Sequence, residues 1–172
     1  MVMKLDDVDT RCIADDSLPW LPLAPYAELA SVKLLSVDPL RGEVILVLRA
    51  APGVQLPRHR TSGSTTIYTV QGRWKYREHE WVAGPGSLVI EPASACNTPQ
   101  ILADGTDDAI MLLLIGGDVH LLDADDRVVS IENWRTAVNR YLDYCRANEI
   151  EPRNITSQGG CTEACSETRG AA

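Results

Sequence analysis

The residues with the clearest chemical potential lie in the segment Pro57-Arg58-His59-Arg60-Thr61. An imidazole titrates near neutral pH, so His59 can act as a general base or as a hydrogen-bond donor. Successive side chains of a strand point to opposite faces, which puts His59 and Thr61 on one face and both arginines on the other. The alternative is a histidine that is only hydrogen-bonded inside a packed barrel. We favour the catalytic interpretation.

Short apolar segments separated by glycine and proline surround this site. Strands are predicted at residues 32–37, 43–49, 65–76 with a break at Gly72, 87–91, 109–115 and 119–122. Strands this short, at this regular spacing, are typical of an antiparallel sandwich or a small barrel. The sequence therefore predicts an all-β domain.

One helix is predicted after the strands. Ser130 is its expected N-cap, and the helix should end near Asn148. Spacings of three and four residues indicate one apolar stripe that packs on the outside of the barrel. The stripe consists of Ile131, Trp134, Val138, Tyr141, Leu142 and Cys145.

The chain of 172 residues has the length of one domain, which is expected to span residues 18–150. Residues 18–26 contain three prolines and should form an extended cover on the sheet. Residues 1–17 are predicted to be flexible and residues 151–172 disordered. Cys161 and Cys165 lie in that tail, where an incidental pair is favoured over a disulfide or metal clip.

The charge balance excludes several function classes. The sequence has 16 basic and 24 acidic side chains and a net charge of -8, without the basic patch that nucleic-acid binding requires. No apolar run approaches the roughly 20 residues that cross a bilayer. The first sixteen residues lack the pattern of a signal peptide, so a cytoplasmic protein with free thiols is expected.

The segment around His59 resembles the first sequence motif of the cupin superfamily, a jelly-roll barrel. His59 fits the first histidine ligand of that motif, and Gly72 fits its glycine. Thr61 stands where the second histidine belongs, and Thr65 stands where the glutamate belongs. The resemblance implies that the face shared by His59 and Thr61 is the interior of the barrel.

Residues 86–97 resemble the second cupin motif. Gly86 and Pro92 fit its glycine and proline, while Ser94 replaces a glycine and Asn97 replaces the third histidine. Together the two motifs imply a single-domain cupin jelly-roll barrel with one C-terminal helix packed outside. They also imply that Asn97 approaches His59 inside the barrel.

The wider pattern resembles the cupin branch of acetylacetone dioxygenase and dihydroxyacetophenone dioxygenase. Members of that branch hold Fe(II) with three histidines and cleave carbon–carbon bonds beside carbonyls with O₂. The resemblance covers roughly residues 18–125. It is carried by residues 33–38, 48–49, 52–53, 72–78, 81, 83–84 and 91–92.

The replaced positions weigh against a metal, because Fe(II) or Zn(II) wants about three imidazole or carboxylate ligands. A threonine hydroxyl and an asparagine amide are much weaker donors. No metal or other cofactor is therefore expected, although His59 with Glu78 is the alternative ligand pair. Residues 78–80 are expected to form an outward-pointing turn, and His79 and His120 to be solvated turn histidines.

A histidine, a hydroxyl and an amide in a water-poor cavity can orient a carbonyl and move a proton. His59, Thr61 and Asn97 are therefore the catalytic candidates. The substrate-binding candidates are Thr65, Trp74, Tyr76, Glu91 and Cys96. Structural alternatives are open for four of them: Trp74 and Tyr76 as packing residues, Glu91 as a strand-end carboxylate rather than a partner of His59 or Asn97, and Cys96 as a buried inert thiol.

Three functions follow from this pattern. The first is metal-independent isomerisation, cyclisation or dehydration of an enolisable carbonyl compound, such as an aromatic or secondary-metabolite substrate. The second is an Fe(II)-dependent dioxygenase that cleaves a diketone or hydroxyketone, and the third is a small-molecule-binding barrel without catalysis. The resemblance also implies a homodimer.

Overall fold

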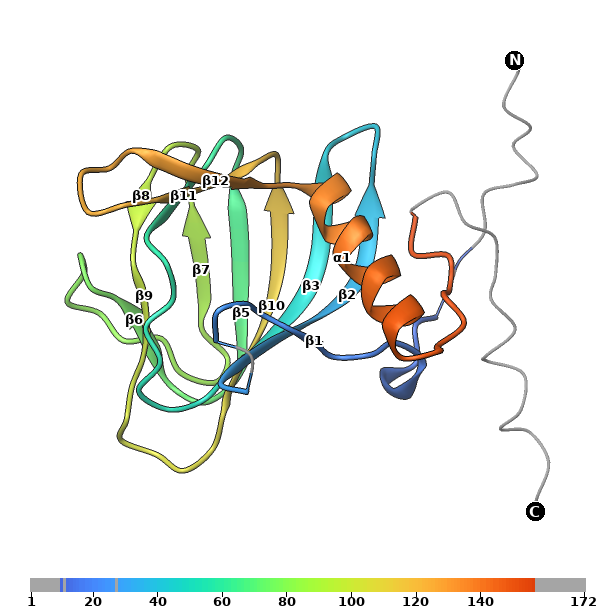
Figure 1. Ribbon diagram of the computed structural model, residues 1–172. Helices are drawn as coiled ribbons and strands as arrows, with labels where there is room; N and C mark the ends of the chain where they lie inside the picture. Colours follow the sequence, from blue (N-terminus) through green and yellow to red (C-terminus); the bar gives the residue numbers. More distant parts are fainter. Residues whose placement is uncertain (1–9, 11, 27, 157–172) are drawn as a thin grey trace.

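The computed structural model describes residue 10, residues 12–26 and residues 28–156. A short 3-10 helix, η2, is followed by strands and one C-terminal α-helix (Figure 1). The bounds are η2 Asp15–Ser17, β1 Leu21–Pro22, β2 Ala30–Asp38, β3 Glu43–Ala50, β4 His59–Thr61, β5 Thr65–Gln71, β6 Trp74–Tyr76, β7 Leu88–Glu91, β8 Cys96–Asn97, β9 Pro99–Ile101, β10 Ala109–Gly116, β11 Val119–Leu122, β12 Val128–Glu132 and α1 Trp134–Ala147.

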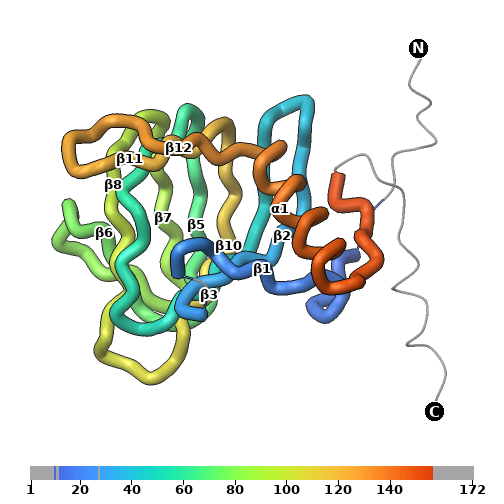
Figure 2. The backbone as a smooth tube through the Cα atoms, in the orientation of Figure 1, coloured from blue at the N-terminus to red at the C-terminus, as the bar shows by residue number. Residues whose placement is uncertain are grey.

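The strands form two main layers. One sheet has the order β1-β2-β3-β10-β5-β7, and the other has the order β12-β11-β4-β8, with β6 and β9 as a separate pair. The named strands pair antiparallel, and the sheets do not close into one continuous barrel (Figure 2). The prediction of an all-β jelly roll with one C-terminal helix is confirmed.

Alternation along β5 explains what this sheet presents to the interior. Thr65, Ile67 and Thr69 are buried, whereas Tyr68 and Val70 are exposed on the outer face. Strand β5 lies between β10 and β7, so its inward side chains stand in the middle of the layer. The interior therefore receives hydroxyl groups as well as apolar side chains from one strand.

Gly72 ends β5 and allows the chain to turn into β6, as the predicted break required. Its φ of +76° lies in the left-handed region, and an added Cβ would stand 2.6 Å from the Ala109 Cα. Both the conformation and the close approach demand glycine. The β10–β5 register shifts between Ile110 and Met111, beside this contact.

The helix begins later than predicted. Ser130 and Ile131 belong to β12, and Asn133 is the N-cap, with its side chain accepting from the backbone of Arg135 and Thr136. Ser130 stays in a strand because residues 128–132 pair with β11, and the next residue that can cap the helix is Asn133.

The buried face of α1 is close to the predicted stripe. Tyr141 and Cys145 are buried, whereas Leu142 is exposed and Ala137 packs against the core instead. No helix formed by the described residues has the length and hydropathy needed to span a membrane.

The proline-rich segment covers the sheet as expected. Leu18 and Leu21 are buried, β1 pairs with β2, and the Trp20 ring lies near the charged groups of Lys33 and Arg49. The 3-10 helix Asp15–Ser17 falls inside the segment predicted to be flexible; residues 1–9 and 11 lie outside the described part.

At the other end the ordered chain runs further than predicted. Ile155 is buried, and its carbonyl accepts from the Val37 backbone at 2.8 Å. The backbone N–H of Arg153 donates to the Tyr141 hydroxyl at 2.8 Å. The disorder predicted from residue 151 therefore does not hold for this short stretch. Cys161 and Cys165 lie outside the described residues.

Candidate functional site

A cavity of about 150 Å³ lies between the two sheets, surrounded mainly by apolar side chains such as Leu48 and Met111. A few polar and aromatic groups from β4 to β7 interrupt this apolar wall. They are His59, Thr61, Thr65, Trp74, Tyr76 and Glu91. A mostly apolar pocket with a few polar groups is the usual form of a small-molecule site.

Strand pairing brings the motif positions together. His59 of β4 pairs with Asn97 of β8, and Thr65 of β5 pairs with Glu91 of β7. The hydroxyls of Thr61 and Thr65 stand 3.4 Å apart and join the two sheets. Residues that the sequence places up to 38 positions apart therefore meet, because directly paired residues share one face of a sheet.

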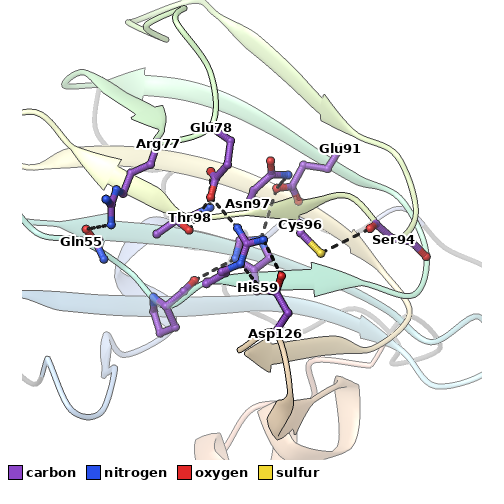
Figure 3. Close-up of polar contacts among 12 residues, drawn as sticks. Gln55, His59, Arg77, Glu78, Glu91, Ser94, Cys96, Asn97, Thr98 and Asp126 are labelled. Atoms are coloured by element: carbon purple, nitrogen blue, oxygen red, sulfur yellow. Dashed lines mark hydrogen bonds and ion pairs between the residues drawn. The ribbon is translucent and has the colours of Figure 1, made fainter. Parts of the chain in front are cut away.

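His59 is held by one backbone carbonyl and one carboxylate. Its Nδ1 lies 3.2 Å from the Pro57 carbonyl oxygen, and its Nε2 lies 3.4 Å from Glu91 Oε1 (Figure 3). A carbonyl can only accept, so Nδ1 carries a proton. Burial lowers the pKa of His59, but the hydrogen bond and charge of Glu91 outweigh it, and the pKa is raised.

Glu91 is the carboxylate of the cavity, with 4% of its side chain exposed. Asn97 Nδ2 donates to Glu91 Oε1 at 3.1 Å. Burial raises the pKa of Glu91, yet His59, Tyr76 and Asn97 together lower it below its ordinary value. The contact between them thus favours the charged form of each group, the imidazolium of His59 and the carboxylate of Glu91.

Tyr76 places a neutral hydroxyl beside this pair. Burial and the negative charge of Glu91 raise the pKa of Tyr76 far above its ordinary value. The Tyr76 Oη finds no hydrogen-bond partner of normal geometry among the described residues, although the hydroxyl is near enough to influence Glu91. A buried hydroxyl without a partner is costly, and a polar group in the cavity would satisfy it.

Trp74 and Tyr76 both line the cavity. Trp74 Nε1 donates to Thr69 Oγ1 at 2.8 Å, and the two rings meet edge to face at 5.1 Å. Trp81 packs against both rings from outside and does not line the cavity. Packing thus fixes the orientation of the two aromatic walls.

As predicted, Glu78 lies exposed in the turn after β6, where hydrogen bonds and an ion pair hold its carboxylate. Its carboxylate accepts from the backbone and hydroxyl of Thr98, at 2.9 and 2.7 Å, and from Arg58 at 2.7 Å (Figure 3). Burial raises the pKa of Glu78, but the bonds from Thr98 and the charge of Arg58 lower it overall. Arg58 also pairs with Asp126, so this network connects the turn after β6, the residue between β8 and β9, and the loop before β12.

Two predicted roles are not supported by position. Cys96 pairs with Arg60 on the face opposite His59, and its sulfur faces the Ser94 carbonyl rather than the cavity, so the predicted substrate contact is wrong. His120 is not in a turn: it lies in β11 with its Nδ1 buried and unpartnered among the described residues. His79 does lie exposed in a turn, stacked on Trp81.

The donor set does not fit a transition metal. Only His59 and Glu91 are strong donors in the cavity, and each faces the other at 3.4 Å. Across the described residues no three His, Cys, Asp or Glu side chains come together. Both oxygens of Glu78, the other predicted ligand, are already bonded by Thr98 and Arg58. A site with about three imidazole or carboxylate donors is therefore not assembled.

Two turns near β7 have backbone in the left-handed region. Gly86 has φ of +86°, and Ser94 has φ of +68°. A non-glycine residue in this region is uncommon, so the conformation at Ser94 is a special feature of the turn that leads from β7 to β8.

This architecture is that of a cupin. Residues 9–113 match the ChrR cupin-like domain family, and the chain belongs to that family. A search of curated protein sequences found no match.

Solved structures agree with this assignment. An RmlC-like cupin protein from Ralstonia eutropha JMP134 is 41% identical, with a TM-score of 0.86, over 91% of this chain and 100% of that chain. A cupin-like protein of unknown function from the same organism is 20% identical, with a TM-score of 0.77, over 84% and 90%. An acetylacetone dioxygenase from Acinetobacter johnsonii is 14% identical, with a TM-score of 0.70, over 83% and 97%. The last two likenesses show the fold alone.

The structure gives Glu91 a more central position than the sequence did. It contacts both His59 and Asn97, whereas the sequence left a partner role and a strand-end role open. Asn97 does not line the cavity but stands behind Glu91. In the sequence, the signal for the role of Glu91 was its position directly before Pro92 of the second motif, on the strand that pairs with Thr65.

Proposed function

We propose that this protein is an enzyme that moves a proton on an enolisable carbonyl compound without using a metal. The observation that carries the proposal is the pair formed by His59 and Glu91 in an otherwise apolar cavity, with Nε2 and Oε1 3.4 Å apart. An acid and a base with oppositely shifted pKa values in one cavity are typical of proton-transfer sites.

The chemistry needs no other reagent. The Glu91 carboxylate takes the proton from the carbon beside the carbonyl, the carbon–hydrogen electron pair forms the new double bond, and the carbonyl oxygen takes the Nε2 proton of His59. The product is the enol, with Glu91 protonated and His59 neutral. A carbonyl re-forms when protonated Glu91 gives its proton to carbon and neutral His59 takes the hydroxyl proton, which restores both groups to their starting charges. With an α-hydroxy ketone, Glu91 can return the proton to the former carbonyl carbon while His59 takes the proton of the neighbouring hydroxyl, which gives the isomeric carbonyl compound.

The neighbouring groups support this assignment. Thr61, Thr65 and Tyr76 offer hydroxyls to the cavity and can hold the carbonyl end of a substrate. Asn97 touches Glu91 and not the cavity, so its role is that of a positioning residue.

The test is deuterium incorporation from D₂O into hydroxyacetone and phenylacetone, with chelator present. Catalysed exchange is expected, and Glu91→Gln should lower its rate by roughly 10²–10⁴-fold, since general acid–base catalysis contributes that much. Glu80→Gln is the matched control, because Glu80 is exposed on the turn after β6.

Exchange that depends on added Fe(II), or O₂ consumption with a diketone, would favour the dioxygenase. Binding of either ketone without any exchange would favour a non-catalytic barrel. Wild-type activity in Glu91→Gln would also refute the proposed mechanism.

The homodimer stays a prediction, for which the outer face of the six-stranded sheet offers a surface. Apolar side chains are exposed there on three adjacent strands, and β7 is an edge strand. They are Tyr68, Val70, Leu88, Ile90 and Leu114. Contiguous exposed apolar patches commonly mark protein interfaces.

A further inference from the structure

A second, larger chamber of about 220 Å³ lies beside the site. Its lining residues include side chains from α1 and from β1, β2 and β3, the strands at the end of the long sheet that lies away from β7 (Figure 1). Its walls include Val32, Leu34, Val44, Leu46 and, from α1, Ala137. These side chains have no polar groups, so the chamber differs sharply from the His59 cavity.

The two spaces share walls. Seven residues line both of them, Leu48, Leu113 and Leu121 among them. Five of the seven belong to β3, β10 and β11, so these strands contribute to the walls of both spaces. A molecule with its polar end at His59 can therefore extend along these strands into the chamber.

The polar groups at the far end of the chamber are already bonded. Glu132 accepts from Arg140 at 2.6 Å and from the Thr136 hydroxyl at 2.9 Å, and Asn133 caps α1. Glu132, Arg140 and Asn133 therefore have partners within the protein and do not need a polar ligand. Water in an apolar space gains few hydrogen bonds, whereas a hydrocarbon group that displaces it is favoured.

We propose that this chamber binds the hydrocarbon part of the substrate, an alkyl or aryl tail, while the carbonyl end lies between His59 and Glu91. The substrate class is thus a carbonyl compound with an alkyl or aryl tail at least as large as one benzene ring. The assignment of the carbonyl end rests on the proposed function; the apolar chamber itself does not.

The first experiment compares acetone, phenylacetone and benzylacetone by calorimetric titration and by methyl NMR. Affinity should rise by roughly ten-fold or more from acetone to phenylacetone, because burying a ring removes apolar surface from water. Phenylacetone should shift the methyl signals of Val32 and Val44, which line only the chamber. Acetone should shift only Ile67 and Met111, which line only the His59 cavity.

The second experiment fills the chamber. Ala137→Phe puts a ring into it from α1 and should lower phenylacetone affinity at least ten-fold while leaving acetone affinity unchanged. Asn139→Phe is the matched control, because Asn139 lies exposed on the same helix. If Ala137→Phe does not fold, the wild-type methyl shifts decide alone.

Butylbenzene, which has no carbonyl, separates the two proposals. If it shifts Val32 and Val44 while hydroxyacetone shows no catalysed exchange, the chamber stands and the proposed function fails. If hydroxyacetone exchanges but neither phenylacetone nor butylbenzene reaches the chamber methyls, the chamber assignment is overturned and the proposed function stands.

Discussion

The two ends of the interior are built in opposite ways. At the His59 end, polar groups from β4, β5, β7 and β8 pair with one another, and little freedom is left to them. At the α1 end the surface is mostly apolar, with Val32 and Val44 among its walls, and Glu132 and Arg140 are bonded to each other. Directional contacts fix orientation, whereas apolar burial scales with area. The comparison suggests that reaction type and tail selectivity are determined by different strands.

The largest effect is expected when the polar end of the interior is converted into a metal site. Thr61→His with Asn97→His adds two imidazoles near His59, because Asn97 pairs directly with His59 and Thr61 lies two residues further along the same strand. With three imidazoles the double variant should bind Zn(II) at least roughly a hundred-fold more tightly than the wild type. Isothermal titration measures the difference.

Thr98→His with Asn97→His is the control, because Thr98 is committed to Glu78 rather than to the cavity. Equal affinity in both double variants would show that the motif positions do not converge as the geometry requires.

Weakening the helix that closes the apolar end should have a smaller effect. Asn133→Ala removes the two backbone bonds that the Asn133 side chain accepts at the start of α1. The free energy of unfolding should fall by about 1 kcal/mol, as is usual for loss of an N-cap. Urea denaturation measures it, with Asn139→Ala on the exposed side of α1 as control. A loss of phenylacetone exchange without loss of stability would contradict a purely structural role for the cap.

The pH dependence of the unfolding free energy tests the polar end of the interior. The direction of the change is predicted from the His59–Glu91 pair. The pKa of His59 is raised above 6.5 and that of Glu91 is lowered below 4.5 in the folded protein. Stabilisation by the pair is then fully present between about 4.5 and 6.5. It is lost as the pH rises through the folded pKa of His59 and as it falls through that of Glu91.

Denaturation of the wild type and of His59→Gln across this range provides the measurement. The difference in unfolding free energy should be largest inside the window and should shrink above it. In Glu91→Gln the histidine lacks its partner, so the decline should begin at lower pH. A difference that grows with rising pH would show that His59 is neutral in the folded state.

The sequence predicted the fold better than the site. Period-two alternation and glycine breaks located β2, β3, β5, β10 and β11 within a few residues. Residues 74–76, beyond the break at Gly72, are β6, as predicted; the two-residue strands β1 and β8 and the three-residue strand β9 carry too few residues for a pattern. The error at Ser130 arose because a serine before an apolar stripe resembles a cap, while pairing with β11 keeps that residue in a strand.

Within the site, spacing identified His59, Thr61, Thr65 and Asn97, which strand pairing and the hydroxyl contact do bring together. It could not show that Asn97 stands behind Glu91, because that depends on side-chain direction across two sheets. Cys96 was misplaced for a similar reason: alternation beside Asn97 turns it to the opposite face. The apolar chamber could not be predicted from a sequence motif, because it is formed by side chains that pack between several strands and α1.

The position of Trp74 gives the protein a built-in optical signal. Its indole is 1% exposed, lines the cavity and donates to Thr69, whereas Trp81 is 39% exposed. Fluorescence from an indole in such surroundings lies toward the blue and responds to a changed local field. Occupancy of the cavity should thus be readable as a spectral change, without a label, in the same cuvette that holds the substrate.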